Sequence, residues 1–201
     1  LLRASDFKGA LGETNNPEWK TVAIDAKSGK PVVPNGSAGF RWGEEGKWNI
    51  VPADSQTGKS IRPRKTLLGA HEDIVKVAFP YFGGQTHEYF TAVPGEEIQL
   101  RRVPVRTVIL ADGSQARVAS VFDLMAANLG IDRGLGGANV ANHYDDDRVP
   151  GTPAWQEKIT GVSREKAIQI AREFADNADK TKGRSMIIVG AAMNHWYHMD
   201  M

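Results

Sequence analysis

The chain has 201 residues, a formal net charge of +1 and 41% hydrophobic residues, which is typical of a globular chain with one domain or a domain and a half. It contains no cysteine, which excludes disulfides, thiolate zinc sites and an iron–sulfur cluster held by its own side chains. Its apolar stretches are far too short to cross a bilayer, and its scattered lysines and arginines argue against nucleic-acid binding.

The first hundred residues are predicted to be rich in turns and β-strands. Residues 21–24 and 31–33 favour strands and flank a turn in which Gly29 supplies a positive φ, a pattern that predicts a hairpin. Residues 40–42 and 48–51 flank a second glycine-containing turn in the same way. We therefore expect two short hairpins in this part of the chain.

The middle of the chain contains the clearest hairpin signal. After a polar stretch at 54–65, predicted to be a solvent-exposed loop, and an aromatic turn at 79–84, two β-favouring runs occupy 106–110 and 115–119. They are joined through Asp112-Gly113, a strong short-range turn signal. We expect these two runs to pair as antiparallel strands.

A short helix is predicted over 121–129, with Ser120 as its N-cap and Gly130 as its end. Glycine, asparagine and aspartate dominate 134–147, which predicts a long loop. Its three adjacent carboxylates at 145–147 are more typical of a solvated turn than of a metal site, because adjacent side chains do not converge on one ion.

The last fifty residues carry the pattern of half an α/β unit. Ser163 is a predicted N-cap for a helix over 163–178, whose apolar residues recur at three- and four-residue spacing. A glycine turn leads to 185–189, apolar at consecutive positions 186–189 as in a strand buried on both faces. Gly190 then opens a loop over 190–198, at the place where ligands bind in open α/β sheets.

The fold class expected from these elements is mixed α/β, incomplete at both ends. Residues 1–150 would form a β-rich, loop-rich lobe, and 151–201 the start of a Rossmann-like αβα domain. The chain begins without a polar lead-in and stops in a cluster of aromatic residues and histidines, whereas domains usually end in polar, frayed residues. We therefore expect a piece of a longer protein.

The loop after the predicted last strand contains the candidate ligand contacts. Gly190 lets a ligand approach the backbone, Asn194 offers both a donor and an acceptor, and His195 hydrogen-bonds or exchanges a proton near neutral pH. Two alternatives stay open here: the aromatic residues form a core cap with hydrogen-bonded histidines, or His195 and His198 share a metal ion.

Several motifs resemble the alpha subunit of membrane-bound respiratory nitrate reductases, in the molybdopterin oxidoreductase superfamily. The most specific is the helix–strand pattern that ends in Asn194-His195-Trp196-Tyr197-His198. The matching stretches run from end to end of the chain, at 16–21, 39–43, 79–84, 159–164, 171–181, 183–190 and 194–198. One departure is Ala192, where relatives often have glycine.

The resemblance implies nitrate reduction to nitrite at molybdenum held by bis(molybdopterin guanine dinucleotide). It also implies a 4Fe–4S cluster with ligands outside this chain, an iron–sulfur beta subunit and a quinol-oxidising cytochrome b subunit that holds the enzyme at the cytoplasmic face of the cell membrane. Gly190, Asn194 and His195 would contact the cofactor, with His195 as a hydrogen-bond donor that orients the pterin or the nitrate oxygens rather than as a metal ligand.

Two other functions remain open from the sequence. A related molybdenum enzyme acting on chlorate, perchlorate or selenate would share the fold and the cofactor. A non-catalytic domain that uses its aromatic N-terminal lobe as an interaction module is the alternative from a different class.

Overall fold

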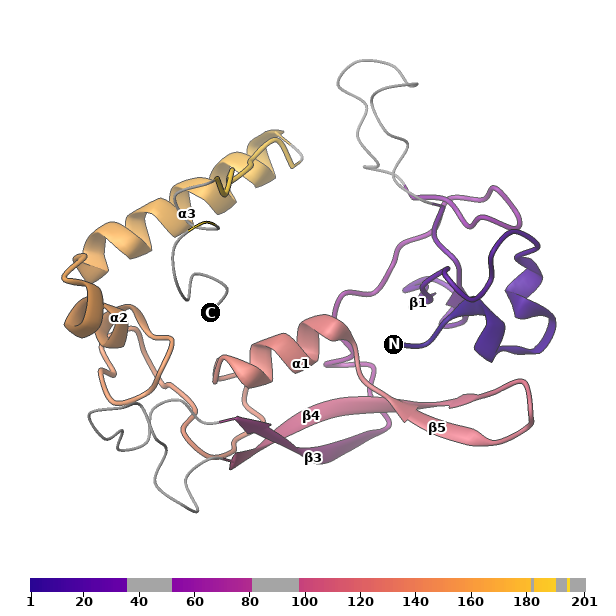
Figure 1. The fold of residues 1–201 in the computed structure, drawn as a ribbon, viewed down its shortest axis with the longest axis horizontal. Helices are drawn as coiled ribbons and strands as arrows, with labels where there is room; N and C mark the ends of the chain where they lie inside the picture. The colour runs from indigo at the N-terminus through magenta and orange to yellow at the C-terminus, as the bar shows by residue number, and fades with distance from the viewer. Residues whose placement is uncertain (36–51, 81–97, 182, 191–194, 196–201) are drawn as a thin grey trace.

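The computed structural model describes residues 1–35, 52–80, 98–181, 183–190 and 195 (Figure 1). The predicted hairpin at 40–42 and 48–51 lies outside these residues, as does the aromatic turn beyond Pro80. The described elements combine helices with antiparallel sheets, which confirms the expected mixed α/β class.

Residues 1–35 form a small N-terminal lobe with two short 3-10 helices and a hairpin. The elements are η1 (Ala4–Asp6), η2 (Lys8–Gly12), β1 (Ala23–Ile24) and β2 (Pro31–Val32). β1 and β2 pair antiparallel, with Ala23 opposite Val32, and Gly29 has a φ of 69° in the turn between them. The first predicted hairpin is confirmed, although its strands are only two residues long.

Asp25 fixes the turn of that hairpin. Its Oδ2 accepts hydrogen bonds from the backbone N–H and the hydroxyl of Ser28 at 2.8 and 2.7 Å, and its Oδ1 accepts one from Arg62 N at 2.9 Å. The bond from Arg62 contributes most to a lowered pKa of the Asp25 carboxyl. The Asp25 carboxylate thus links the β1–β2 turn to the segment around Arg62.

The larger of the two described sheets is three-stranded and antiparallel. It is built from β3 (Asp73–Pro80), β4 (Ile98–Ile109) and β5 (Gln115–Val118), in the order β3-β4-β5. The pairing of Ile109 with Gln115 and of Arg106 with Val118 confirms the predicted hairpin around Asp112-Gly113. The sequence did not indicate β3 or the first half of β4. These two strands pair antiparallel, from Asp73 opposite Val105 to Pro80 opposite Ile98.

The first half of β4 reverses the usual pattern of apolar residues inside and polar residues outside. Gln99 and Arg101 are buried, with 6% and 2% of their surface exposed, whereas Ile98 and Leu100 are 65% and 51% exposed. A buried arginine needs its donors satisfied, because desolvation without partners is costly. Its partners come from the helix and loop that follow the sheet.

Helix α1 (Val121–Asn128) lies along the sheet in Figure 1 and contributes to the small core of Phe79, Val103 and Ala127. Ser120 caps it, since its hydroxyl accepts a hydrogen bond from Asp123 N at 3.0 Å. Gly130 follows with a φ of 69°, as predicted for the end of this helix.

Two helices close the described chain, α2 (Pro153–Thr160) and α3 (Arg164–Thr181). Ser163 caps α3 as predicted, because its hydroxyl accepts a hydrogen bond from Lys166 N at 3.1 Å, and α3 runs three residues further than expected. α2 was not predicted. It has Thr152 as its N-cap, proline in its first turn and Gly161 at its end in the left-handed region.

The predicted buried strand at 185–189 is wrong for this chain. These residues form no strand, and Met186 and Ile188 are 79% and 82% exposed. A strand buried on both faces needs strands beside it and helices over it, and the described residues supply neither. The predicted division into domains at 150 remains a prediction.

No helix within the described ranges has both the length and the apolar character needed to cross a membrane.

Candidate functional site

Of the predicted ligand loop, the structure describes Gly190 and His195. Both are exposed, and a Cβ added at Gly190 would have no atom of the described residues within 4 Å. Asn194 and His198 lie outside the described residues. The roles of Gly190, Asn194 and His195 therefore remain predictions.

The base of this loop is nevertheless fixed to α3. Asn177 Nδ2 donates to Arg184 O at 3.0 Å and to Ser185 Oγ at 2.8 Å. Ser185 Oγ in turn donates to Phe174 O at 3.0 Å. These side-chain bonds turn the chain back along the helix and set the direction in which 186–190 leaves it.

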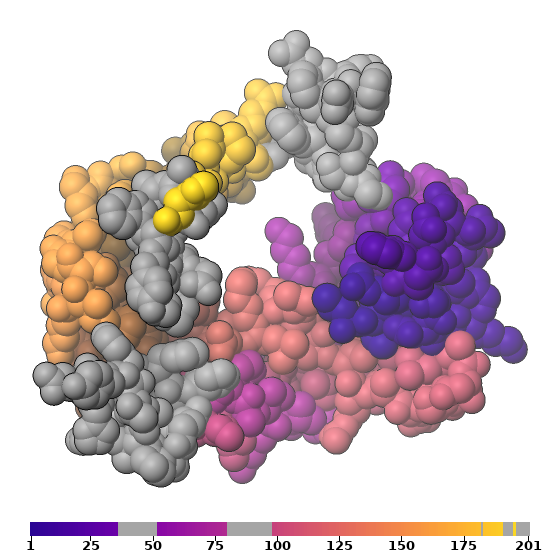
Figure 2. All heavy atoms as spheres, viewed as in Figure 1, coloured from indigo at the N-terminus to yellow at the C-terminus, as the bar shows by residue number. Residues whose placement is uncertain are grey.

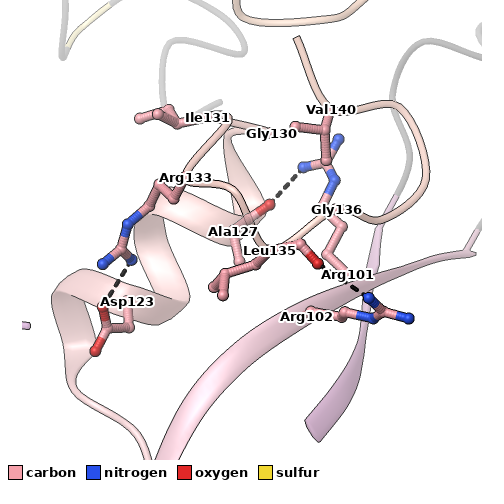
Figure 3. A pocket seen from close by; sticks show the side chains of 10 residues that line it. All are labelled: Arg101, Arg102, Asp123, Ala127, Gly130, Ile131, Arg133, Leu135, Gly136 and Val140. Carbon is pink, nitrogen blue, oxygen red and sulfur yellow. Dashed lines mark hydrogen bonds and ion pairs between the residues drawn. The ribbon is translucent and has the colours of Figure 1, made fainter. Parts of the chain in front are cut away.

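A buried polar cluster lies elsewhere, around Asp123 on α1 (Figure 3). This carboxylate has no exposed surface. It accepts hydrogen bonds from Leu67 N at 2.7 Å, Thr66 Oγ1 at 2.5 Å and Ser120 Oγ at 2.8 Å, and pairs with Arg133 Nη1 at 2.6 Å. The Thr66–Leu67 segment, more than fifty residues away, thus meets α1 and Arg133 at one charge.

Two effects compete at the Asp123 carboxyl. Burial raises its pKa, but the hydrogen bonds, led by that from Leu67 N, outweigh burial and lower the pKa below its usual range. Asp123 is therefore ionised at neutral pH and has every oxygen occupied. Such a group holds segments together and is poorly suited to proton transfer, which needs a pKa near the working pH.

A second cluster surrounds the buried guanidinium of Arg101 (Figure 3). Nη1 donates to Ala127 O and Asn128 O, both at 2.6 Å, so the cation sits at the negative end of α1. Nε donates to Ala138 O at 3.0 Å, and Nη2 donates to Asn139 O at 2.8 Å. Arg101 thus joins β4 to the end of α1 and to the loop at 138–139.

Two glycines make room for Arg101. A Cβ at Gly130 would lie 2.8 Å from Arg101 Nη2 and 2.9 Å from Asn139 O, and a Cβ at Gly137 would lie 3.1 Å from Arg101 Cα. Both glycines also have positive φ. The loop predicted over 134–147 therefore owes part of its glycine content to a close approach to the sheet.

The cavity beside Arg101 and Asp123 is about 10 Å³, which holds roughly one water molecule. Its walls are drawn in Figure 3. Leu135 O accepts a 3.3 Å hydrogen bond from Arg102 Nη1 across its edge. A cavity of this size does not admit a nucleotide or a pterin, so the two clusters serve as scaffold.

No group of three histidine, aspartate or glutamate side chains within the described ranges is placed to hold a metal ion. The three carboxylates of the 145–147 turn pair with different cations, and Asp146 is buried rather than solvated as expected. The pairs are Asp145 with Arg164 at 2.9 Å, Asp146 with Arg148 at 3.2 Å and Asp147 with Lys158 at 2.6 Å.

Sequence reasoning did not find Arg101, Asp123 or Arg133. Asp123 occurs three residues after the N-cap, a position that suggests a local capping contact and gives no sign of Arg133 or the Thr66 segment. The available signal for Arg101 was indirect, namely the glycines at 130 and 137.

No family model matches the chain. Over its full 201 residues it is 57% identical to the respiratory nitrate reductase 1 alpha chain of Escherichia coli (strain K12), of which it spans 16%. It is 53% identical to the respiratory nitrate reductase 2 alpha chain of the same organism, again spanning 16%. It is 25% identical to the perchlorate reductase subunit alpha of Dechloromonas aromatica (strain RCB), with all of this chain and 16% of that protein aligned.

The chain thus covers a small share of each of these relatives, but the similarity to the two E. coli proteins includes its every segment. The resemblance in the short motifs extends to the whole sequence. This chain is homologous, over its entire length, to one segment of the respiratory nitrate reductase alpha chains.

Proposed function

We propose that this chain is part of the catalytic alpha subunit of a respiratory nitrate reductase, which reduces nitrate to nitrite and water with two electrons. The observation that carries the proposal is the identity of 57% and 53% with two alpha chains of that name, over the full length of this chain. The perchlorate reductase subunit, at 25% identity, is a more distant relative. Nitrate is therefore favoured over perchlorate as the substrate.

The family resemblance implies molybdenum as the cofactor, and we infer that two molybdopterin guanine dinucleotides hold it. The described residues do not form a complete site for this group, because they contain no cluster of three metal-binding side chains and the cavity beside Arg101 is about 10 Å³. The 4Fe–4S cluster needs cysteines, and this chain has none. The cysteine ligands of that cluster therefore belong to other parts of the alpha subunit, and no catalytic step is assigned to the described residues.

The contribution of this chain to the cofactor would come from its C-terminal loop. Gly190 and His195 are exposed, and Asn177 and Ser185 fix the base of the loop to α3. Gly190, Asn194 and His195 would contact the pterin in the complete subunit, with His195 donating a hydrogen bond to the pterin or to a nitrate oxygen.

The complete enzyme would work with an iron–sulfur beta subunit and a quinol-oxidising cytochrome b subunit. Electrons would pass from the quinol through the beta subunit to molybdenum. The alpha subunit would be peripheral to the membrane and would reach its cytoplasmic face through these partners.

Substrate assays of the full-length alpha subunit with its partners test the proposal. Purified enzyme should contain molybdenum and pterin, and with a reduced dye as electron donor its kcat/KM should be higher for nitrate than for chlorate or perchlorate. A higher kcat/KM for perchlorate would instead assign the chain to the related oxyanion reductases. A protein that carries no molybdenum and reduces none of these ions would overturn the proposal.

The role of His195 needs a separate test, with His143→Ala as the matched control. His143 is an exposed loop histidine whose Nδ1 accepts a hydrogen bond from Asp145 N at 3.2 Å. His195→Ala should lower kcat about tenfold or more and alter the electron paramagnetic resonance of molybdenum(V), because groups that orient a metal centre carry effects of this size. Unchanged kcat and spectrum at full cofactor content would remove His195 from the site.

A further inference from the structure

Two stretches near the start of the chain share one sequence pattern, which we name the first repeat (residues 23–35) and the second repeat (residues 52–64). The matching runs are Asp25-Ala26-Lys27-Ser28-Gly29-Lys30 and Asp54-Ser55-Gln56-Thr57-Gly58-Lys59. In each repeat an aliphatic residue and a proline follow at equal distances, namely Val32 and Pro34 or Ile61 and Pro63. The first repeat contains the β1–β2 hairpin, and most of the second lies in the stretch predicted to be a solvent-exposed loop.

The turns of the two repeats are closed by the same hydrogen bonds. Asp25 accepts bonds from the backbone N–H and the hydroxyl of Ser28, as described above. Asp54 Oδ2 accepts them from the backbone N–H and the hydroxyl of Thr57, at 3.2 and 2.7 Å. The glycine that follows has a φ of 69° in the first turn and 66° in the second, and donates to the aspartate carbonyl at 2.8 and 2.9 Å. This geometry accounts for the repeated aspartate, hydroxyl residue and glycine.

The start of the first repeat is paired with the end of the second. Ala26 N donates a hydrogen bond to Arg62 O at 2.7 Å. Arg64 N donates one to Ile24 O, also at 2.7 Å. The backbone partner of the first turn therefore comes from the other repeat.

The start of the second repeat is paired with the end of the first in the same manner. Ser55 N donates a hydrogen bond to Val33 O at 2.8 Å. Asn35 N donates one to Ala53 O, also at 2.8 Å. Each of these four residues occupies the position in its repeat that a residue of the preceding contact occupies in the other repeat.

Exchange of the two repeats thus converts one contact into the other. The isolated antiparallel bridges obey the same rule, because Asp25 lies opposite Pro63 and Asp54 lies opposite Pro34. Reciprocal pairing of this kind is the internal equivalent of the contact between two identical subunits related by a twofold axis. Figure 2 shows the indigo atoms of residues 1–35 packed against the violet atoms that follow residue 52.

The repeats differ where the second one contacts the rest of the chain. Ser55, which stands where the first repeat has Ala26, donates a hydrogen bond from its hydroxyl to Glu13 Oε2 at 2.8 Å. The neighbouring Gln56 lies so close to Gly12 that a Cβ on that glycine would meet its side chain. The residues common to both turns serve the turns and their pairing, whereas these two differing residues serve an outside contact.

We propose that residues 23–35 and 52–64 are two copies of one structural unit and that they order together as a single interlocked pair. Each copy presents the surface to which the other binds, because the start of each is paired with the end of the other. Loss of either turn therefore opens both copies. The inference goes beyond the proposed function and does not depend on it.

The test is hydrogen exchange, measured by mass spectrometry on the full-length alpha subunit with its partners. The readout is the exchange of backbone N–H groups that bond across the pair, at Ala26, Asn35, Ser55 and Arg64. Thr57→Val keeps the shape of the side chain but removes the hydroxyl from the second turn. Exchange at all of these groups should become about tenfold faster, since a hydrogen bond to a charged acceptor is lost.

Two further variants make the test specific to the repeat. Thr57→Ser gives the second turn the serine of the first, so it should leave the exchange rates unchanged. Ser28→Val removes the hydroxyl from the first turn and should accelerate the same N–H groups as Thr57→Val does.

Ser114→Val is the matched control outside the pair. The Ser114 hydroxyl donates to Asp112 Oδ1 at 2.6 Å in the β4–β5 turn, which is closed by the same residue types. This variant should accelerate exchange in its own turn and leave the N–H groups that bond across the pair unchanged.

The pattern of acceleration decides the proposal. If Thr57→Val and Ser28→Val each accelerated exchange in their own repeat alone, the repeats would be independent hairpins and the proposal would be wrong. Equal acceleration throughout α1 would also overturn it, because the pair would then not be a separate unit. Nitrate turnover does not enter the readout, so failure of the proposed function would leave this result unaffected.

Discussion

Two regions of this chain are stabilised in different ways. The region of β4, α1 and the loop up to 139 is joined by buried ions, with Arg101 and Asp123 bonded to segments distant in sequence. α3 has no buried residue, and Phe174 on its apolar stripe is 39% exposed. It is held to its surroundings by α2 and by surface pairs such as Arg164 with Glu157 at 2.6 Å. The first region is held by buried ionic contacts between segments of the chain, whereas the second is held by surface contacts and leaves its apolar stripe partly exposed.

The largest expected effect is that of Arg101→Met. It removes the donors of four backbone carbonyl groups and of Gln99 at a site that is 2% exposed. Opening of α1 should become easier by at least about 3 kcal/mol, because buried acceptors lose their partners. Hydrogen exchange of α1 amides in the full-length subunit measures this. Arg102→Met is the matched control: Arg102 is exposed and, among the described residues, makes one hydrogen bond of 3.3 Å, so equal exchange in both variants would contradict the role of Arg101.

Asp123→Asn should give the next largest effect. The amide keeps the shape of the side chain but loses the charge opposite Arg133 and turns a donor toward Leu67 N. We expect a loss of about 2 kcal/mol in local stability, seen as faster exchange of amides in α1 and at 66–67. Asp132→Asn, an exposed acceptor for Gly134 N in the same loop, should change little. If both variants exchange alike, the Asp123 cluster does not hold these segments together.

Acid should reproduce the Asp123 effect in the unsubstituted protein. The folded-state pKa of Asp123 is lowered, so its contribution is complete above the unfolded pKa of about 3.9 and is lost as pH falls through the folded pKa. Local opening of α1 should therefore become easier below about pH 4. The pH profile of hydrogen exchange, corrected for the intrinsic rate, checks this. Asp123→Asn should flatten the profile, and an unchanged slope would exclude Asp123 as its source.

The smallest effect within the chain is expected at its C-terminal region. Ile188 is 82% exposed, so Ile188→Ser should leave the unfolding of residues 1–201 almost unchanged. In the full-length subunit the same change should cost about 2 kcal/mol if strands and helices of the remaining chain cover this side chain. Thermal unfolding of the two proteins, each compared with its unsubstituted form, makes the comparison. Equal shifts in both would show that 186–189 stays exposed in the whole subunit.

Turn and capping residues in the sequence correctly predicted one hairpin and the starts of two helices. Asp112-Gly113 marked the β4–β5 hairpin, and Ser120 and Ser163 marked the starts of two helices, since a cap or a tight turn needs particular residues within three or four positions. The helix α2 was missed despite Thr152-Pro153 and Gly161, because its eight residues show no clear apolar stripe.

Tertiary contacts were beyond the reach of these signals. The pairing of β3 with β4 was missed because the buried Gln99 and Arg101 give β4 a polar inner face. Asp123 meets the Thr66 segment across more than fifty residues, a contact that no local pattern encodes. The strand predicted at 185–189 was wrong within this chain because burial on both faces depends on neighbours that the described residues do not include.

The close approach of Gly130 and Gly137 to Arg101 has a consequence for how such a chain can change. Any larger side chain at either glycine would press on the guanidinium or on the strand that bears it, and a shorter residue at 101 would leave the loop without its anchor. Loss of the arginine alone would not free either glycine, because both have positive φ and a Cβ would still meet Asn139 O from position 130 and the backbone of residue 101 from position 137.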